Sequence, residues 1–285
     1  MSLNSVNMGT VWDRATEFLG DNIAAVTPIA LAAIFLPASI NDAIAPLATS
    51  NPGMQTGINV AGLLLAVVSV FGQLAIIAMA VDHGRTAAEA ARSALAQLLM
   101  AIIITILVVA LVMIGLLPLV GLLVAAGIDV KVFASNDQAA IAQTLSAMPT
   151  GFGWAIAAYS LLWVIGSIWA SARFSLGFPA LVDERRGFGA LARSWQLTRG
   201  LALKIVGVLL LYVIVSGVAA LAAKAAFGGV LGLVAGGTAP GSFAAVVTSI
   251  AVGAVGTAFA VLQAAFIAKL FVAARDRAQE VTGSQ

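Results

Sequence analysis

Residues 98–125 read LLMAIIITILVVALVMIGLLPLVGLLVA and contain no charged side chain. A helix needs about 20 apolar residues to cross the hydrocarbon core of a membrane, so this stretch is long enough to span one. Five further apolar runs accompany it. We therefore predict an all-α, polytopic membrane bundle with six transmembrane helices, at roughly 23–40, 57–80, 98–125, 152–181, 201–222 and 242–272.

The composition of the whole chain indicates the same class. Of its 285 residues, 61% are hydrophobic and 9% are charged, and the mean hydropathy is +1.07. A soluble domain has about 25% charged residues, which argues against a soluble enzyme, a disordered chain and a nucleic-acid binder. The chain has no cysteine and one histidine, His83, which excludes thiolate chemistry and a His-rich metal cluster. We predict no cofactor and no catalytic site, with His83 as a solvated loop residue rather than an acid–base partner of Asp82.

Basic residues are distributed unequally between the predicted loops. If the N-terminus is cytoplasmic, 12 of the 14 Lys and Arg residues lie toward the cytoplasmic side, and only Lys131 and Lys224 lie outside. The positive-inside rule then predicts that both termini are cytoplasmic. We expect a single integral domain, 1–285, in the bacterial cytoplasmic (inner) membrane. We expect the first run to be a retained span rather than a signal peptide, because acidic residues precede it together with Arg14.

Two charged loops resemble each other. Residues 81–93 read VDHGRTAAEAARS and residues 182–194 read VDERRGFGALARS, with six of 13 positions identical at an offset of 101. Each loop is expected to lead into the next span through a short amphipathic helix at the cytoplasmic interface. Thr86 and Glu89 have the spacing of a capping box for the first of these helices.

A weaker third copy precedes the first span, with Val11, Ala15, Phe18 and Leu19 on one apolar face and with Thr10 and Asp13 placed to cap it. These copies predict a three-unit internal repeat, roughly 8–81, 82–182 and 183–278. The alternative is that inner loops look alike because all of them carry arginines and a surface helix.

Arg173 is the most informative charge, because it lies about ten residues before Asp183 within the predicted fourth span. A charge at the bilayer centre costs about 2.5–3.5 kcal/mol. Pro179, however, predicts that this span ends near Phe178, and such an end would place Arg173 closer to the interface. Arg173 therefore either binds a headgroup or substrate anion, or it snorkels or forms an ion pair that fixes helix packing.

The charged inner surface also has two interpretations: recognition of anionic lipid headgroups, or the positive-inside rule alone. Lys224 and Lys269 are expected to snorkel to the interfaces. The candidate headgroup or anion contacts are Arg173, Arg185, Arg186, Arg193, Arg199, Lys204, Arg85 and Arg92; the candidate ion-pair partners are Asp82, Asp183 and Glu184; the candidate interfacial anchors are Trp12 and Trp195.

Two further segments leave alternatives open. The small residues Gly241, Ala245, Ser249 and Gly253 recur every four positions on the sixth span, which favours close packing within the chain or contact with a second copy or a partner membrane protein. The Gly-rich stretch 223–240 is typical of a continued fifth span, a short outer loop or a re-entrant piece.

The stretch 173–204, RFSLGFPALVDERRGFGALARSWQLTRGLALK, resembles the signature of the bacterial glycerophosphoryl diester phosphodiesterase membrane-domain family and of the related YciC-like membrane proteins. The resemblance rests on Arg173, Pro179-Ala180, Glu184, Gly187, Ala190-Leu191, Arg193-Ser194-Trp195, Leu197-Thr198 and Arg199-Gly200. It implies a six-helix membrane module linked to phospholipid or envelope metabolism. Some members of this family are fused to a soluble phosphodiesterase barrel that uses His, Glu and a divalent metal. A barrel of about 250 residues has no place in this chain, so the hydrolase activity is not transferred.

From these observations we expect a non-enzymatic accessory or scaffold protein that engages phospholipid headgroups at the cytoplasmic face. The alternative is a small-solute or lipid transporter with a cavity near Arg173.

Overall fold

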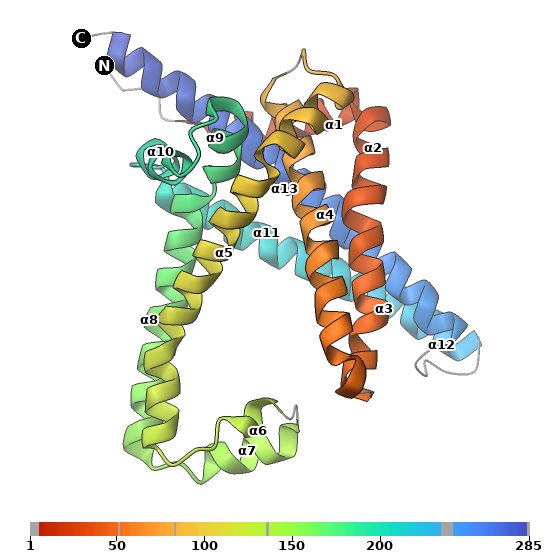
Figure 1. Cartoon of the computed structure of the whole chain (residues 1–285), viewed down its shortest axis with the longest axis vertical. Helices are drawn as coiled ribbons and strands as arrows, with labels where there is room; N and C mark the ends of the chain where they lie inside the picture. The colour runs from red at the N-terminus through yellow and green to blue at the C-terminus, as the bar shows by residue number, and fades with distance from the viewer. Residues whose placement is uncertain (1–5, 51, 83, 135–136, 235–241, 284–285) are drawn as a thin grey trace. The chain divides into compact units, whose positions relative to one another are not determined.

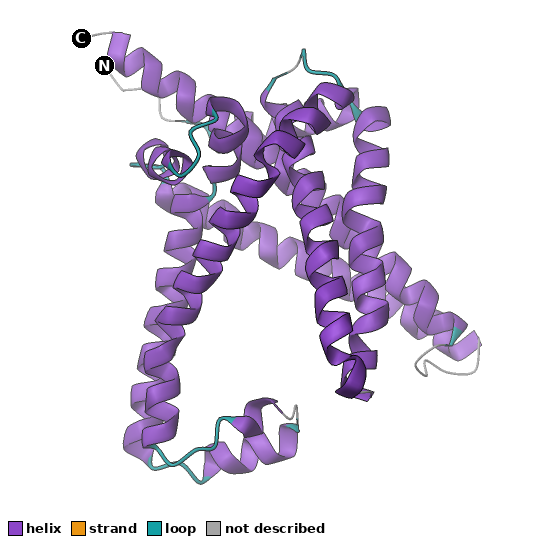
Figure 2. Ribbon diagram, in the orientation of Figure 1, coloured by secondary structure: helices purple, strands orange, loops and turns teal. Residues whose placement is uncertain are grey.

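The computed structural model describes residues 6–50, 52–82, 84–134, 137–234 and 242–283. Within these residues the secondary structure is helical and contains no strand (Figure 2). Six helical segments of the described chain are long and apolar enough to cross a membrane: Ile23–Ala45, Gln55–Val81, Ala87–Ala125, Thr150–Glu184, Ala202–Leu233 and Phe243–Glu280. The predicted all-helical class is therefore confirmed, and these six segments overlap the six predicted runs.

The chain divides into two compact units, Met1–Ile102 with Ala172–Gln285, and Ile103–Ser171. The first unit holds α1 (Met8–Asp21), α2 (Ile23–Ala30), the π-helix η1 (Leu31–Phe35), α3 (Leu36–Ser50), the 3-10 turn η2 (Pro52–Met54), α4 (Gln55–Val81), the start of α5 (Ala87–Ala125), α9 (Gly177–Glu184), α10 (Gly189–Leu197), α11 (Ala202–Ala223), the π-helix η3 (Lys224–Gly229), α12 (Val230–Val234) and α13 (Phe243–Gly283). The second unit holds the rest of α5, α6 (Lys131–Ala134), α7 (Gln138–Ser146) and most of α8 (Thr150–Phe174).

The core of the first unit forms around α13, which packs against α1, α4 and α11 (Figure 1). Phe271 is its largest fully buried side chain. Glycine allows helices to approach closely here: a Cβ added at Gly72 of α4 would lie 2.6 Å from the Cβ of Ala33 in η1. A Cβ at Gly253 of α13 would lie 3.3 Å from the ring of Phe35. Small residues thus form the tightest helix contacts, as expected for membrane helices.

The predicted small-residue face of the sixth span is divided between burial and exposure. Gly253 packs within the chain, as described above, whereas Ser249 is exposed and Ala245 is half-buried. Gly241 lies outside the described residues. Contact with a second copy or a partner protein through this face stays a prediction.

The amphipathic helix α1 covers part of α13. Its buried face consists of Val11, Ala15 and Phe18, three of the four residues that the sequence predicts, and the fourth, Leu19, is half-buried. Its N-cap is Asn7, whose side-chain oxygen accepts a hydrogen bond from the Gly9 N–H at 2.9 Å. The prediction that Thr10 and Asp13 cap this helix is therefore wrong, because the helix begins at Met8, before either residue.

The prediction that Lys269 extends to the membrane interface is wrong. It is 2% exposed on α13, and its Nζ lies 4.8 Å from the centroid of the Phe18 ring on α1. Arg14, Glu17 and Asp21 line the same pocket. The reason is tertiary: α1 lies over α13 and encloses the ammonium group.

The second predicted loop copy forms a separate short helix, α10, but the first copy does not. Gly200, at φ +76°, interrupts the chain between α10 and α11. The first copy has no glycine at the matching position, and α5 runs without a break from Ala87. Its predicted capping box is confirmed: Glu89 accepts a hydrogen bond from the Thr86 N–H at 2.9 Å, and the Thr86 hydroxyl accepts one from the Glu89 N–H at 3.3 Å.

Two predicted span ends also differ in the structure. The apolar segment that contains α8 and α9 runs to Glu184 and so includes the predicted run 152–181. Helix α8 itself ends at Phe174, four residues before the end near Phe178 that Pro179 indicates, and α9 begins at Gly177 with Pro179 in its first turn. A first-turn N–H has no helical partner, so proline is tolerated there. The fifth span continues beyond Ala223 through η3 and α12 to Val234, which favours the continued-span alternative up to that residue.

In the second unit, α5 and α8 pack side by side. The Trp163 ring occupies the space where a Cβ at Gly115 would lie, and the Tyr159 hydroxyl donates a hydrogen bond to the Gly115 carbonyl. Helix α7 begins at the cap residue Asp137, whose carboxylate accepts from the N–H groups of Ala139 and Ala140. This short helix buries none of its side chains among the described residues.

Candidate functional site

The break between α8 and α9 is stabilised by a serine from a third helix. Ser194 on α10 is fully buried, and its hydroxyl donates to the Arg173 carbonyl at 2.7 Å. The same oxygen accepts from the Leu176 N–H at 3.1 Å. Thr198, also fully buried, lies one helical turn further and donates to the Ser194 carbonyl at 2.9 Å. A helix end leaves carbonyl and N–H groups without helical partners, and Ser194 satisfies one of each.

Ion pairs join α9, α10 and α13 beside this break. Glu184 pairs with Arg193 Nε at 2.9 Å and with Arg186 Nε at 2.6 Å. Asp183 accepts from Arg275 Nη1 at 2.6 Å, across 92 residues of sequence. We refer to these five residues as the charged junction. Two carboxylates therefore fix three guanidinium groups, and the last of these belongs to α13.

Arg173 precedes Asp183 of the charged junction by ten residues. Its side chain stacks on an aromatic ring. Its guanidinium carbon is 4.9 Å from the centroid of the Trp195 ring, which also contacts Phe174 at 5.7 Å between centroids. A cation over an indole face gains about 0.5–2 kcal/mol. The side chain of Arg173 is half-buried, so it lies neither in open solvent nor deep inside the bundle.

Arg185 has an unusual backbone conformation. It ends α9 at φ +51° and is the sole non-glycine residue with a positive φ in the described chain. The left-handed conformation costs a residue with a Cβ about 1 kcal/mol relative to glycine. Gly187, two positions later, also has a positive φ of 56°. The turn therefore directs an exposed arginine away from α9 at a cost in backbone energy.

The packing face of α10 is formed by small and aliphatic residues rather than aromatic ones. Ala190, Ser194 and Leu197 are buried, whereas Phe188 is 56% exposed and Trp195 is 37% exposed. The two aromatic side chains thus lie on the outer side of α10, where Trp195 also packs on Phe174. Arg185, Arg199 and Lys204 are exposed beside it and form no ion pair with another residue of the described chain.

The structure brings together most of the predicted residues of the second loop copy but fewer of those in the first. Arg85 lies 3.8 Å from Asp82, and Arg92 is exposed on α5. Ser93, which matches Ser194, is buried, but its hydroxyl has no hydrogen-bond partner among the residues described. His83 lies outside the described residues. Trp12, the other predicted anchor, is 43% exposed and contacts Phe266 at 6.2 Å between ring centroids.

Sequence reasoning did not identify Arg275 or Ser194 as structural partners. Arg275 is distant in sequence, and a single chain offers no signal that couples it to Asp183. Ser194 was recognisable as one of the identical positions of the two loops, but its hydrogen bonds depend on the helix break near Ser175. No group of His, Asp and Glu within the described residues is arranged to hold a metal ion.

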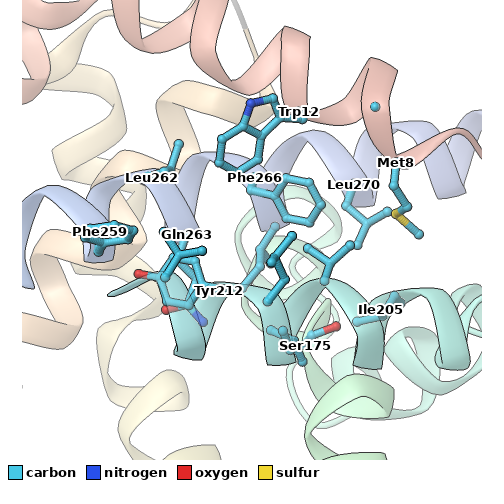
Figure 3. Close-up of a pocket in the computed structure, with 16 residues that line it drawn as sticks. Met8, Trp12, Ser175, Ile205, Tyr212, Phe259, Leu262, Gln263, Phe266 and Leu270 are labelled. Carbon is cyan, nitrogen blue, oxygen red and sulfur yellow. The ribbon is translucent and has the colours of Figure 1, made fainter. Parts of the chain in front are cut away.

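An apolar cavity of about 400 Å³ lies between α1, α11 and α13 (Figure 3). Ser175, at the break between α8 and α9, closes one side of it. Tyr212 and Phe259 meet edge-to-face at 5.7 Å between centroids in its wall. Arg173 is not among its sixteen lining residues but precedes the lining residue Ser175 by two positions, and the cavity near Arg173 that the transporter hypothesis requires stays a prediction.

Comparison with protein-family models, curated proteins and solved structures found no match for this chain. The resemblance of residues 173–204 to the glycerophosphoryl diester phosphodiesterase membrane-domain family therefore rests on those residues and stays a prediction.

Proposed function

We propose that this protein is a non-enzymatic accessory or scaffold protein of the bacterial inner membrane that binds anionic phospholipid headgroups at its cytoplasmic face. The contacts are the exposed Arg185, Arg199 and Lys204, and the exposed rings of Phe188 and Trp195 enter the acyl boundary beside them. A surface of this kind, with aromatic rings flanked by arginines, is typical of helices that lie in a membrane interface. In this proposal α1 and α10 are interfacial helices, and both termini are cytoplasmic.

The observation that carries the proposal is the backbone of Arg185. Glycine would fit its positive φ at lower energy, and the side chain makes no ion pair with another described residue. Residues held in sparsely populated conformations cluster at functional sites. An arginine at this position therefore supports a contact outside the chain, and the phosphate of a lipid headgroup is the anion that a membrane surface offers.

The test uses a substitution that should not destabilise the fold. Arg185→Gly removes the charge and relieves the backbone strain, so it is combined with Arg199→Gln. Each basic residue near an anionic surface contributes about 1 kcal/mol, or about fivefold in affinity. Native mass spectrometry of the protein from vesicles containing phosphatidylglycerol should then show at least several-fold lower retention of that lipid. Lys131→Gln, which removes one exposed charge from the other unit, is the matched control.

Equal retention of phosphatidylglycerol by the wild type, the double variant and the control would contradict the proposal. A thermal melt of each protein in detergent accompanies the measurement. The double variant should unfold at or above the wild-type temperature, so that a loss of lipid is not attributable to unfolding.

The repeat and the family resemblance are part of the same proposal. Ser93 and Ser194 occupy matching positions and are both buried, which supports a common origin of the two loops. The family resemblance supports a role in phospholipid or envelope metabolism. Transport of a small solute or lipid remains the alternative, and its test is flux into proteoliposomes that falls when Arg173 is changed to Gln.

A further inference from the structure

The cavity between α1, α11 and α13 has the depth of one membrane leaflet. Its α11 wall runs from Ile205 to Val215, ten residues or about 15 Å along a helix. Its α13 wall runs in the opposite direction from Leu270 to Phe259, and Figure 3 shows Ile205 and Leu270 toward one end and Phe259 toward the other. The hydrocarbon core is about 30 Å thick, so half of it matches the length of these walls.

The lining of the cavity is chemically suited to hydrocarbon. Most of its sixteen residues are aliphatic or aromatic, and the polar side chains among them are Ser175, Tyr212, Gln263 and the indole of Trp12. No charged residue lines it. A volume of about 400 Å³ is within the usual range of small-molecule sites and corresponds to about thirteen waters at 30 Å³ each. One acyl chain fits this description better than a polar solute does.

Two basic residues lie close in sequence to lining residues of the cavity, although neither of them lines it. Lys204 directly precedes Ile205 and is exposed. Arg173 lies two residues before Ser175, with its guanidinium group on the Trp195 ring. Around Tyr212 and Phe259, at the opposite end, the stretches 205–223 and 243–268 contain no charged side chain. Basic residues therefore flank one end of the cavity, and its walls are apolar along the depth of a leaflet, which is the arrangement that a phospholipid requires.

We infer that this cavity holds one acyl chain of an anionic phospholipid from the leaflet at the Lys204 end. Lys204 and Arg173 bind its phosphate, and its second chain stays in the bilayer. The inference rests on the proposed headgroup function. It adds that one lipid molecule is bound at a defined position, with one of its acyl chains inside the cavity.

The experiment is photocrosslinking in membranes. The full chain is reconstituted in phosphatidylcholine vesicles with a phosphatidylglycerol or a phosphatidylcholine probe that carries a diazirine midway along one chain. Peptide mapping by mass spectrometry should place adducts on 205–215 and 259–270, with about fivefold more adduct from the anionic probe. Lys204→Gln should remove most of this preference.

Filling the cavity supplies the matched pair of variants. Val208 lines the cavity, whereas Val213 on the same helix is 64% exposed and does not line it. Val208→Trp should reduce the adducts on both segments several-fold, and Val213→Trp should leave them unchanged. Adducts spread evenly over the lipid-facing helices, or adducts unaffected by Val208→Trp, overturn the inference.

The outcomes also separate this inference from the proposed function. Retention of anionic lipid that depends on Arg185 and Arg199, together with an absence of adducts in the cavity, overturns the cavity site alone. Adducts in the cavity that favour the anionic probe, with retention unchanged in the Arg185→Gly/Arg199→Gln variant, support the cavity site and overturn the proposed surface.

Discussion

Ser194→Ala is expected to destabilise the protein through the break between α8 and α9. The substitution removes the hydrogen bond to the Arg173 carbonyl and the one from the Leu176 N–H. Loss of the partner of a buried N–H costs about 1–3 kcal/mol, and loss of an ordinary hydrogen bond costs about 0.5–1.5 kcal/mol. The Arg173 carbonyl keeps a long contact with the Thr198 hydroxyl at 3.4 Å, so we expect a total loss of about 2–4 kcal/mol.

Ser93→Ala is the matched control, because Ser93 occupies the same position in the first loop copy. Its hydroxyl is buried but has no hydrogen-bond partner in the described chain. Its removal should therefore be neutral or stabilise the protein by up to about 1 kcal/mol. Both variants are unfolded by titration with sodium dodecyl sulfate in mixed micelles, with helicity followed by circular dichroism. Free energies of unfolding that agree within about 0.5 kcal/mol for the two variants would refute the reasoning, since that is the uncertainty of such comparisons.

Three further predictions use the same unfolding assay. A double-mutant cycle of Asp183→Asn and Arg275→Gln should give a coupling energy of about 1–2 kcal/mol, because both side chains are largely buried and share a charged hydrogen bond; additive effects would contradict the pairing. Gly72→Ala should cost about 1–3 kcal/mol, since its Cβ would lie 2.6 Å from that of Ala33, and an unchanged midpoint would show that the helices separate freely. Thr86→Ala should lower the unfolding free energy by about 1 kcal/mol through loss of the capping box; a neutral effect would indicate that the first turn of α5 frays.

The positions of the spans followed from hydropathy because the hydrocarbon core imposes one length on every crossing helix. Local caps were predictable in one case of two: Thr86 with Glu89 caps α5, whereas Asn7 rather than Thr10 caps α1. The residue at which α8 ends was more difficult to predict. Pro179 indicated a break, but a proline fixes only the region of a helix end, and the residue at which the chain departs from the helix depends on Ser194 from another helix.

The environment of individual charges was the least predictable property. Lys269 lies near the end of a span, and the sequence predicts that its side chain extends to the interface, yet α1 covers it. In the sequence Arg275 is one of several basic residues near the C-terminus, yet it binds Asp183. Both outcomes depend on which helices meet, and hydrophobic periodicity within one helix contains no information on that.

On helix α10 the large aromatic side chains lie on the outward face and not on the packing face. In water, large apolar side chains are driven into the protein; in a bilayer the surrounding lipid is equally apolar, and helices associate through small residues instead. Phe188 and Trp195 are accordingly exposed, while Ala190 and Ser194 are buried. The same rule applies to Gly72, whose missing side chain lets α4 approach η1. Helix α1 differs from α10, because its apolar stripe of Val11, Ala15 and Phe18 packs against α13. An amphipathic stripe alone therefore does not identify the packing face in such a protein, whereas a recurrence of small residues indicates where helices meet.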